Sequence, residues 1–170
     1  TVVNYMRKKF GIVDFVITTN TYYARDMLRK KFIEHGNIRI YSLPFDLVYS
    51  IRRFMGIATF KLLIIVETEI WPNLIWMAKK RNIPVLIING RISDKTCNTY
   101  RFFSFFLKDI FSDLSMVLAQ SDLHAERFKS LGMDSAKIVT TGNIKYYREI
   151  EADKNRMSGN FITFGSIKEK

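Results

Sequence analysis

The stretch LLIIVETEIWPNLIWMAKK, residues 62–80, decides the fold, because an apolar run leads directly into two carboxylates and then into Trp-Pro-Asn. The run 62–66 is rich in β-prone residues and too short for a helix, so it predicts a central parallel strand. Pro72 suits the first turn of a helix, where its missing N–H leaves no bond unmade. Glu67 and Glu69 therefore follow the carboxyl end of a strand, which is the edge where ligands bind in open α/β sheets.

Short β-rich runs recur along the chain and alternate with segments of helical spacing. The predicted strands are 13–19, 38–44, 62–68, 84–90, 115–121 and 137–143. The predicted helices are 23–34, 47–55, 72–80, 95–111 and 123–131. This alternation predicts an α/β fold, Rossmann-like, with a parallel sheet covered by helices on both faces.

The two ends of the chain predict a fragment of a larger protein. The opening TVVNYMRKKFG is typical of the end of a helix whose preceding strand is missing. Residues 148–160 form a polar stretch that contains Ser-Gly, as interdomain linkers do, and FITFGS (161–166) indicates one more strand that opens into a loop. We therefore expect a domain over 1–147, a linker over 148–160, and over 161–170 the first strand of a truncated second domain.

The charge of the chain predicts an anionic partner. The 170 residues carry a formal net charge of +11, which favours nucleic acid, a phosphorylated substrate or an acidic membrane surface. The single cysteine, Cys97, excludes an internal disulfide framework. No apolar run approaches the roughly 18 residues of a membrane span, so the chain itself is predicted to be soluble or peripheral.

Motifs for common cofactors are missing from the sequence. Neither G-x-G-x-x-G nor G-x-x-x-x-G-K-[ST] is present, which disfavours a dinucleotide cofactor and a phosphate-loop nucleotidase. His35 and His124 have no Cys or carboxylate at metal-ligand spacing, so we expect surface histidines and no metal.

A second set of polar residues follows the predicted strand 84–90, and it therefore lies at the same edge as Glu67. Arg91 is able to hold a phosphate or a carboxylate with two hydrogen bonds. Asn89 and Ser93 either bind substrate beside it, or only shape the turn and cap the next helix.

The segment TYRFFSFFLKDIF, residues 99–111, is unusually aromatic. Helical spacing places Phe103, Phe106, Leu107 and Ile110 on one face, which predicts ordinary core packing. The alternative is a patch that contacts acyl chains or the bilayer, with Arg101 and Lys108 near lipid phosphates.

Four motifs, taken in order and with their spacing, resemble a known family. They are VETEIWPNLI, IPVLIINGRISDKT, VLAQSDLHAERFKSLGM and VTTGNIKYY. Together they resemble the amino-terminal domain of bacterial 3-deoxy-D-manno-octulosonic acid (Kdo) transferases. Gly90 stands where that family commonly has Ala.

The resemblance implies one half of a two-Rossmann (GT-B type) glycosyltransferase that moves Kdo from CMP-Kdo to a lipid A precursor. It implies an enzyme at the cytoplasmic face of the inner membrane, with its catalytic-base glutamate and its membrane anchor outside this sequence. The expected partners are the lipid A precursor, CMP-Kdo and the acidic membrane surface, without nucleic acid.

The same resemblance implies roles for individual residues. Glu67 and Lys145 match the family's transition-state stabilisers. The expected substrate-binding residues are Glu69, Asn89, Arg91, Ser93 and Asn143. Glu69 has an alternative, which is to pair with a basic neighbour or to bind the helix amino-terminus.

Functions of other classes stay open at this point. The fold is shared by other nucleotide-sugar enzymes with two Rossmann domains, because fold does not fix function. A non-enzymatic basic binding module would also explain the charge, although no stacking sheet or recognition-helix motif is present.

Overall fold

The computed structural model describes residues 2–11, 13–67 and 69–144, and these residues form two compact units. The first unit extends to Ser50 and the second begins at Ile51. The expected linker 148–160 and the strand of 161–170 lie outside the described residues, so the predicted domain boundaries stay predictions.

The first unit is a parallel strand pair with its connecting helix. Its elements are α1 (Val2–Phe10), β1 (Phe15–Thr19), α2 (Tyr22–Lys31) and β2 (Ile38–Ser42). β1 pairs with β2 in parallel, and α2 connects them. Thr21 starts α2, because its side-chain oxygen accepts a hydrogen bond from the N–H of Ala24 at 3.2 Å.

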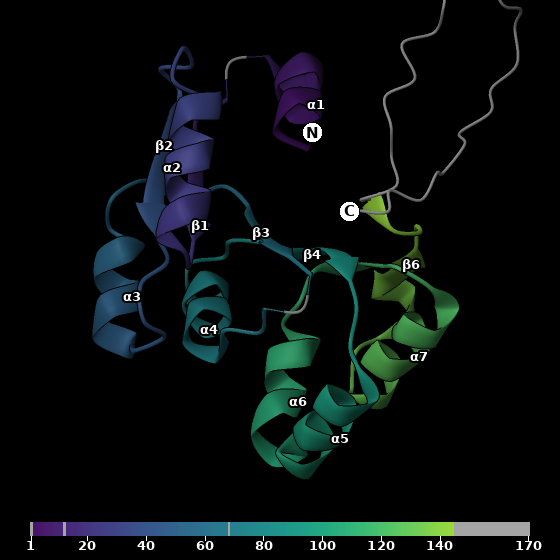
Figure 1. Cartoon of the computed structure of the whole chain (residues 1–170). Coiled ribbons are helices and arrows are strands. Elements are labelled where there is room, and N and C mark those ends of the chain that lie inside the picture. The colour runs from purple at the N-terminus through teal and green to yellow at the C-terminus, as the bar shows by residue number, and fades with distance from the viewer. Residues whose placement is uncertain (1, 12, 68, 145–170) are drawn as a thin grey trace, which may run out of the picture. The chain divides into compact units, whose positions relative to one another are not determined.

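The second unit contains a parallel four-stranded sheet in the order β3-β4-β5-β6 (Figure 1). Its strands are β3 (Leu63–Val66), β4 (Val85–Gly90), β5 (Met116–Ala119) and β6 (Ile138–Thr140). Its helices are α4 (Pro72–Lys80), α5 (Asp94–Phe102), α6 (Ser104–Ser112), α7 (Asp122–Ser130) and a 3-10 turn at Ser135–Lys137, while α3 (Val48–Phe54) crosses the boundary between the units. Strands that are consecutive in the chain are neighbours in the sheet, which confirms the predicted parallel α/β class.

The core of the second unit lies between the sheet and its helices. Its largest fully buried side chains include Phe111 of α6, Phe128 of α7, and Ile87 of β4. Gly90 lets α7 approach β4 closely, since a Cβ at this position would lie 3.1 Å from side-chain atoms of Phe128 and Val117. The ring of Phe128 thus occupies the space that a side chain at position 90 would need.

The predicted single helix over 95–111 is wrong, because the structure has two helices that meet at Phe103. Phe103 ends α5 with φ −93° and ψ 20°, and α6 begins at Ser104. The break turns Ile110 and Phe111 into the core, where they are 9 % and 0 % exposed. A straight helix would have placed Phe103 on the same face as Ile110, seven residues later.

The predicted core face of the aromatic segment is consequently wrong at two positions. Phe103 and Phe106 are 49 % and 72 % exposed, whereas Leu107 is partly buried against the core and Ile110 is buried as expected. Phe102 and Phe105 are 82 % and 86 % exposed. These four rings, Phe102, Phe103, Phe105 and Phe106, are called the aromatic patch below.

Gly132 supplies a stability prediction for the second unit. It follows the end of α7 and has φ +99°, a backbone conformation that residues with a side chain strongly disfavour. Gly132→Ala should lower the free energy of unfolding by about 1–2 kcal/mol. Chemical denaturation followed by circular dichroism measures this change. Gly36→Ala is the control, since a Cβ there meets no atom within 4 Å; equal stability of the two variants would contradict the prediction.

Candidate functional site

The four strands of the second unit bring their carboxyl ends to one edge of the sheet. Backbone hydrogen bonds continue past the strand ends, so the residues that follow are held against the neighbouring strand. These bonds run from the N–H of Glu67 to Ile88, from Gln120 to Gly90 and from Thr141 to Ala119, each with an N···O distance of 2.9 Å. The residues that follow these strands therefore lie at one edge of the sheet, as the sequence predicted.

Glu67 and Arg91 meet at this edge. Nη2 of Arg91 lies 3.2 Å from Oε2 of Glu67, and the side chains are 54 % and 28 % exposed. Glu67 has φ 65°, which is unusual for a long side chain and is found mostly where the surrounding structure compensates for strain. The carboxylate thus stands at a strained strand end, beside an arginine side chain that is about half exposed.

Helix α7 holds the loop that carries Arg91. The guanidinium of Arg127 donates to the carbonyl of Ile92 and to the carboxylate of Asp94. Nδ1 of His124 lies 3.3 Å from the nitrogen and 3.1 Å from the oxygen of Ile92. Because Ile92 itself is fully buried, the backbone next to Arg91 is fixed from both sides.

Glu69 and Ser93 each form a hydrogen bond with a residue close to them in the sequence. Oε2 of Glu69 accepts a hydrogen bond from the indole N–H of Trp71 at 3.0 Å, which is neither of the alternatives expected for this carboxylate. Ser93 is the N-cap of α5, and its oxygen accepts from the N–H of Thr96 at 3.1 Å. Capping was one of the two roles left open for Ser93; a role of either residue in binding substrate stays a prediction.

Asn89 joins two of the motifs through one hydrogen bond. Its side chain is fully buried, and its Oδ1 accepts from the N–H of Ile144 at 3.1 Å. Asn143 lies half-buried in the loop after β6. Lys145 lies outside the described residues. The structure therefore places the start of the TGNIK segment at the predicted edge, and the role of Lys145 stays a prediction.

Sequence reasoning missed Gln120 and misjudged His124. Nε2 of Gln120 donates to the carbonyl of Asn89 at 3.3 Å. Gln120 is a polar residue near the carboxyl end of the predicted strand 115–121, and this position was a usable signal. His124 was expected to be a surface histidine, but it is half-buried and touches the Ile92 backbone. No local sequence pattern predicted that contact, because the two residues are 32 positions apart in the sequence.

Nothing in the described part of the chain forms a metal site or a bilayer span. No group of three or more His, Cys, Asp or Glu residues is placed to hold a metal ion within residues 2–144 as described. None of the helices described is long and apolar enough to cross a membrane.

The arrangement suits a reaction in which opposite charges develop close together. A fixed carboxylate stabilises positive charge on a reacting group, and a guanidinium with free donors binds phosphate or carboxylate. Glu67 and Arg91 provide these two charges on adjacent strand ends. The burial of the Ile92 backbone and its bonds to α7 keep the arginine loop in place before any substrate arrives.

Burial lowers the pKa of His124 below its usual value of 6.5, and the nearby charges of Arg127 and Arg91 lower it further. The unfolded chain therefore binds a proton more readily than the folded protein, so stability should be lost as the pH falls below 6.5. His124→Gln should remove this loss. The free energies of unfolding of the two proteins, measured between about pH 5 and pH 7, should differ progressively with pH.

His35→Gln, in the first unit, is the control for the loss of an imidazole. If the curves of the wild type and His124→Gln ran parallel across this range, burial of His124 would have no effect on its titration in the folded protein.

Comparisons with known proteins agree on one family. Residues 1–148 match the family model described as 3-Deoxy-D-manno-octulosonic-acid transferase (kdotransferase). The chain is 38 % identical over 130 residues to a 3-deoxy-D-manno-octulosonic acid transferase of Haemophilus influenzae, covering 76 % of this chain and 30 % of that protein. It is 32 % identical over 141 residues to the enzyme of the same name from Chlamydophila psittaci, covering 83 % of this chain and 32 % of that protein.

A further relative carries a second activity in its name. The chain is 32 % identical over 145 residues to a bifunctional glycosyltransferase/methyltransferase of Fusobacterium nucleatum, covering 82 % of this chain and 22 % of that protein. The chain thus spans about a third or less of the length of these relatives.

The family match and the architecture support each other. The parallel α/β fold agrees with the predicted amino-terminal, Rossmann-like half of a GT-B glycosyltransferase. The four motifs that carried the resemblance all lie within the matched residues 1–148. The chain belongs to the 3-deoxy-D-manno-octulosonic-acid transferase family.

Proposed function

We propose that the full-length protein containing this chain transfers Kdo from CMP-Kdo to a lipid A precursor. The observation that carries the proposal is the Glu67–Arg91 pair at the carboxyl edge of the parallel sheet, in a chain of this family. The pair offers the two charges that the reaction requires, at the edge where ligands of open α/β sheets bind.

The reaction breaks the bond between the anomeric carbon of Kdo and the phosphate of CMP, and it forms a bond from that carbon to an acceptor hydroxyl. Positive charge develops on the sugar while negative charge grows on the departing CMP. We assign Glu67 to the positive charge. Lys145 is assigned to the negative charge or to the Kdo carboxylate, as the TGNIK motif implies.

Arg91 is assigned to an anionic group of either substrate. One nitrogen of its guanidinium faces Glu67, and the side chain is 54 % exposed, so other donors remain able to reach a phosphate or carboxylate. Glu69, Ser93 and Asn143 complete the proposed substrate-binding set. For Ser93 this role would come in addition to its capping bond.

Glu67→Gln tests the central assignment. It keeps the size of the side chain and removes its charge, so transfer should fall by at least about two orders of magnitude, the effect of losing one preorganised charge contact. Release of CMP from CMP-Kdo in the presence of lipid A precursor measures the rate of the full-length protein. Thermal unfolding should show that the variant is folded.

Glu126→Gln is the matched control, since Glu126 lies on α7 and pairs only with the exposed Lys129 among the interactions described. Its rate should equal that of the wild type. Near-normal turnover by Glu67→Gln would overturn the role of Glu67, and a wild type without transfer would overturn the proposed function itself.

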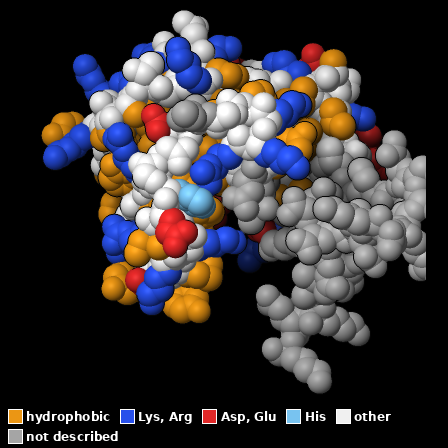
Figure 2. Space-filling model, turned by 90° about the horizontal axis from the view of Figure 1, so that it is seen from above, with side chains coloured by type: hydrophobic (Ala, Val, Ile, Leu, Met, Phe, Trp, Pro, Cys, Tyr) orange, Lys and Arg blue, Asp and Glu red, His pale blue; other side chains and the backbone are white. Residues whose placement is uncertain are grey.

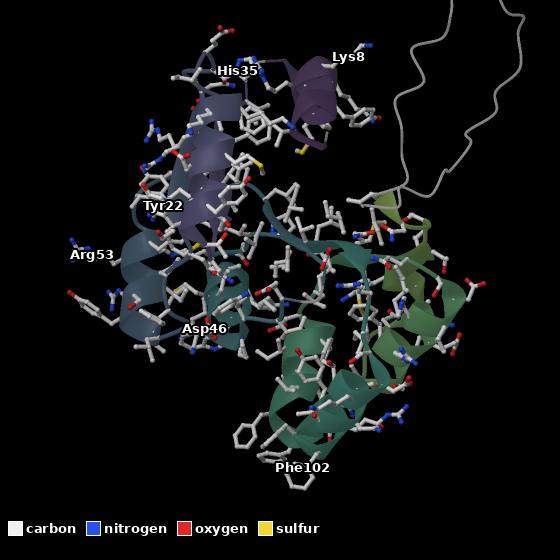
Figure 3. All side chains as sticks on the ribbon, viewed as in Figure 1. Lys8, Tyr22, His35, Asp46, Arg53 and Phe102 are labelled. Carbon is white, nitrogen blue, oxygen red and sulfur yellow. The ribbon has the colours of Figure 1, made fainter. Side chains whose placement is uncertain are left out.

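The aromatic patch supports action at a membrane surface. Its rings form two edge-to-face pairs, Phe102 with Phe103 and Phe105 with Phe106, each with centroids 5.1 Å apart. Figure 3 shows Phe102 pointing away from the ribbon of the second unit, with other aromatic rings beside it. Exposed aromatic side chains that lie together favour an interaction site on a protein.

Charge selects an acidic lipid surface as the partner of the patch. Arg101 and Lys108 flank the four rings in the sequence, and the whole chain carries a net charge of +11. Lysine and arginine side chains also predominate over acidic ones on the face drawn in Figure 2, which is a different face from the one that carries Phe102 in Figure 3. Aromatic rings at the headgroup level together with basic side chains are the two elements of interfacial membrane binding.

The double variant Phe105→Ser/Phe106→Ser should bind acidic vesicles more weakly than the wild type, by roughly tenfold or more, because each buried aromatic ring contributes about 1.5–3 kcal/mol. Co-sedimentation of residues 1–170, checked for folding by circular dichroism, measures this binding. The binding should also weaken as salt rises, since exposed charges are screened beyond about 10 Å at 0.1 M.

Phe45→Ser is the matched control, because Phe45 is 83 % exposed but lies in the first unit. Equal binding of the double variant and the control would show that the aromatic patch does not contact lipid. Equal binding to neutral and acidic vesicles would show that the basic side chains do not contribute to membrane binding.

A further inference from the structure

Asn89 occupies an unusual position for a polar side chain. Among the residues that the structure describes, it is the one polar or charged residue in the buried set, with 0 % exposure. Its Nδ2 has no hydrogen-bond partner in the part of the chain described. A buried amide with an unpaired donor costs about 1–3 kcal/mol. An apolar residue would avoid this cost, so hydrogen bonding of Nδ2 within the described residues does not explain the presence of asparagine here.

The backbone around Asn89 turns its side chain out of the regular strand pattern. The pairing of β4 with β5 shifts register between Ile87 and Gly90, and Asn89 within this irregularity has φ 56°. Irregularities of this kind re-aim side chains, often next to active sites. Asparagine tolerates the left-handed conformation better than most residues, which fits its presence at this position.

The side chain reaches across a strand to the loop after β6. β4 and β6 are not neighbours in the sheet, because β5 lies between them. The Oδ1 of Asn89 nevertheless accepts the N–H of Ile144 at 3.1 Å, joining residues 55 apart in sequence. The same loop is fixed at its start, where the N–H of Thr141 bonds to Ala119 of β5. Asn89 therefore supplies the second anchor of a loop of a few residues.

We infer that Asn89 is a positioning residue that fixes residues 141–144, and that transfer through Lys145, the next residue in the sequence, depends on this anchor. Ile144 immediately precedes Lys145, so its peptide group is the last anchored unit before the lysine. The full burial of Asn89 separates this role from the substrate contact that the sequence predicted for it. The expected effect on kcat rests on the proposed function. The hydrogen bond between Asn89 and Ile144, called the tether below, does not depend on that function.

Asn89→Gly removes the acceptor and keeps a residue that adopts positive φ without strain. In the full-length protein, it should lower kcat by roughly tenfold to a hundredfold, as expected for a displaced catalytic group, with little change in KM for CMP-Kdo or for the lipid A precursor. Asn82→Gly is the matched control, because Asn82 also has positive φ, 54°, but is exposed and precedes β4. Its kcat should equal that of the wild type.

A double-mutant cycle separates positioning from a general structural effect. If Asn89 acts through Lys145, adding Asn89→Gly to Lys145→Ala should cause little further loss of kcat. Losses that multiply independently would overturn the inference. So would a folded Asn89→Gly variant with unchanged kcat, or one in which only KM rises, since that result would make Asn89 a substrate-binding residue.

Hydrogen exchange tests the tether without activity. The amide of Ile144 should exchange slowly in the wild type, although the residue is 36 % exposed, and it should lose this protection in Asn89→Gly but not in Asn82→Gly. An unprotected Ile144 amide in the wild type would refute the tether even if Asn89→Gly failed to fold. A wild type that transfers no Kdo would instead refute the proposed function, with exchange still deciding the tether.

Discussion

The rest of the site depends on the backbone hydrogen bonds that continue past the carboxyl ends of β3, β5 and β6, because they hold three strand ends at one edge of the sheet. Each bond fixes the first residue after a strand to a neighbouring strand of the sheet: Glu67 and Gln120 bond to β4, and Thr141 bonds to β5. Parallel pairing alone brings the ends to one edge. The extra bonds hold Glu67 and the start of the loop at Thr141 against that edge, where Glu67 reaches Arg91.

Two residues at this edge, Glu67 and Asn89, have an unusual backbone conformation. Glu67 and Asn89 both have positive φ directly at or after the ends of adjacent strands, and the described side chains around them hold them in place. Arg91 faces the first, while the N–H of Ile144 and the amide of Gln120 bond to the second. Conformations of this kind persist only where neighbours over-determine them, which is typical of functional sites.

The sequence predicted the elements that depend on local pattern and missed those that depend on distant partners. The short apolar runs and Pro72 placed six strands and the start of α4, because burial on both faces and helix entry leave signatures within a few residues. The break at Phe103 was missed because Thr99 to Phe111 keeps helical spacing throughout, and only the turn of α6 toward the core separates Ile110 from the exposed rings. The contact of His124 with Ile92 has no local signature at all.

Asn89, in the role that we infer for it, would act without touching substrate. Three features of the sequence suggested binding: the strand end, the polar side chain and the neighbouring Arg91. The structure keeps all three and still buries the side chain, since the irregular pairing of β4 with β5 turns it across the sheet toward Ile144. In the role that we infer, Asn89 limits where a loop lies, and a charged group that already stands in place stabilises the transition state without further reorganisation. The physical division at this edge is therefore between the partly exposed ion pair of Glu67 and Arg91 and the buried Asn89 and Ile92, whose contacts hold the neighbouring loops.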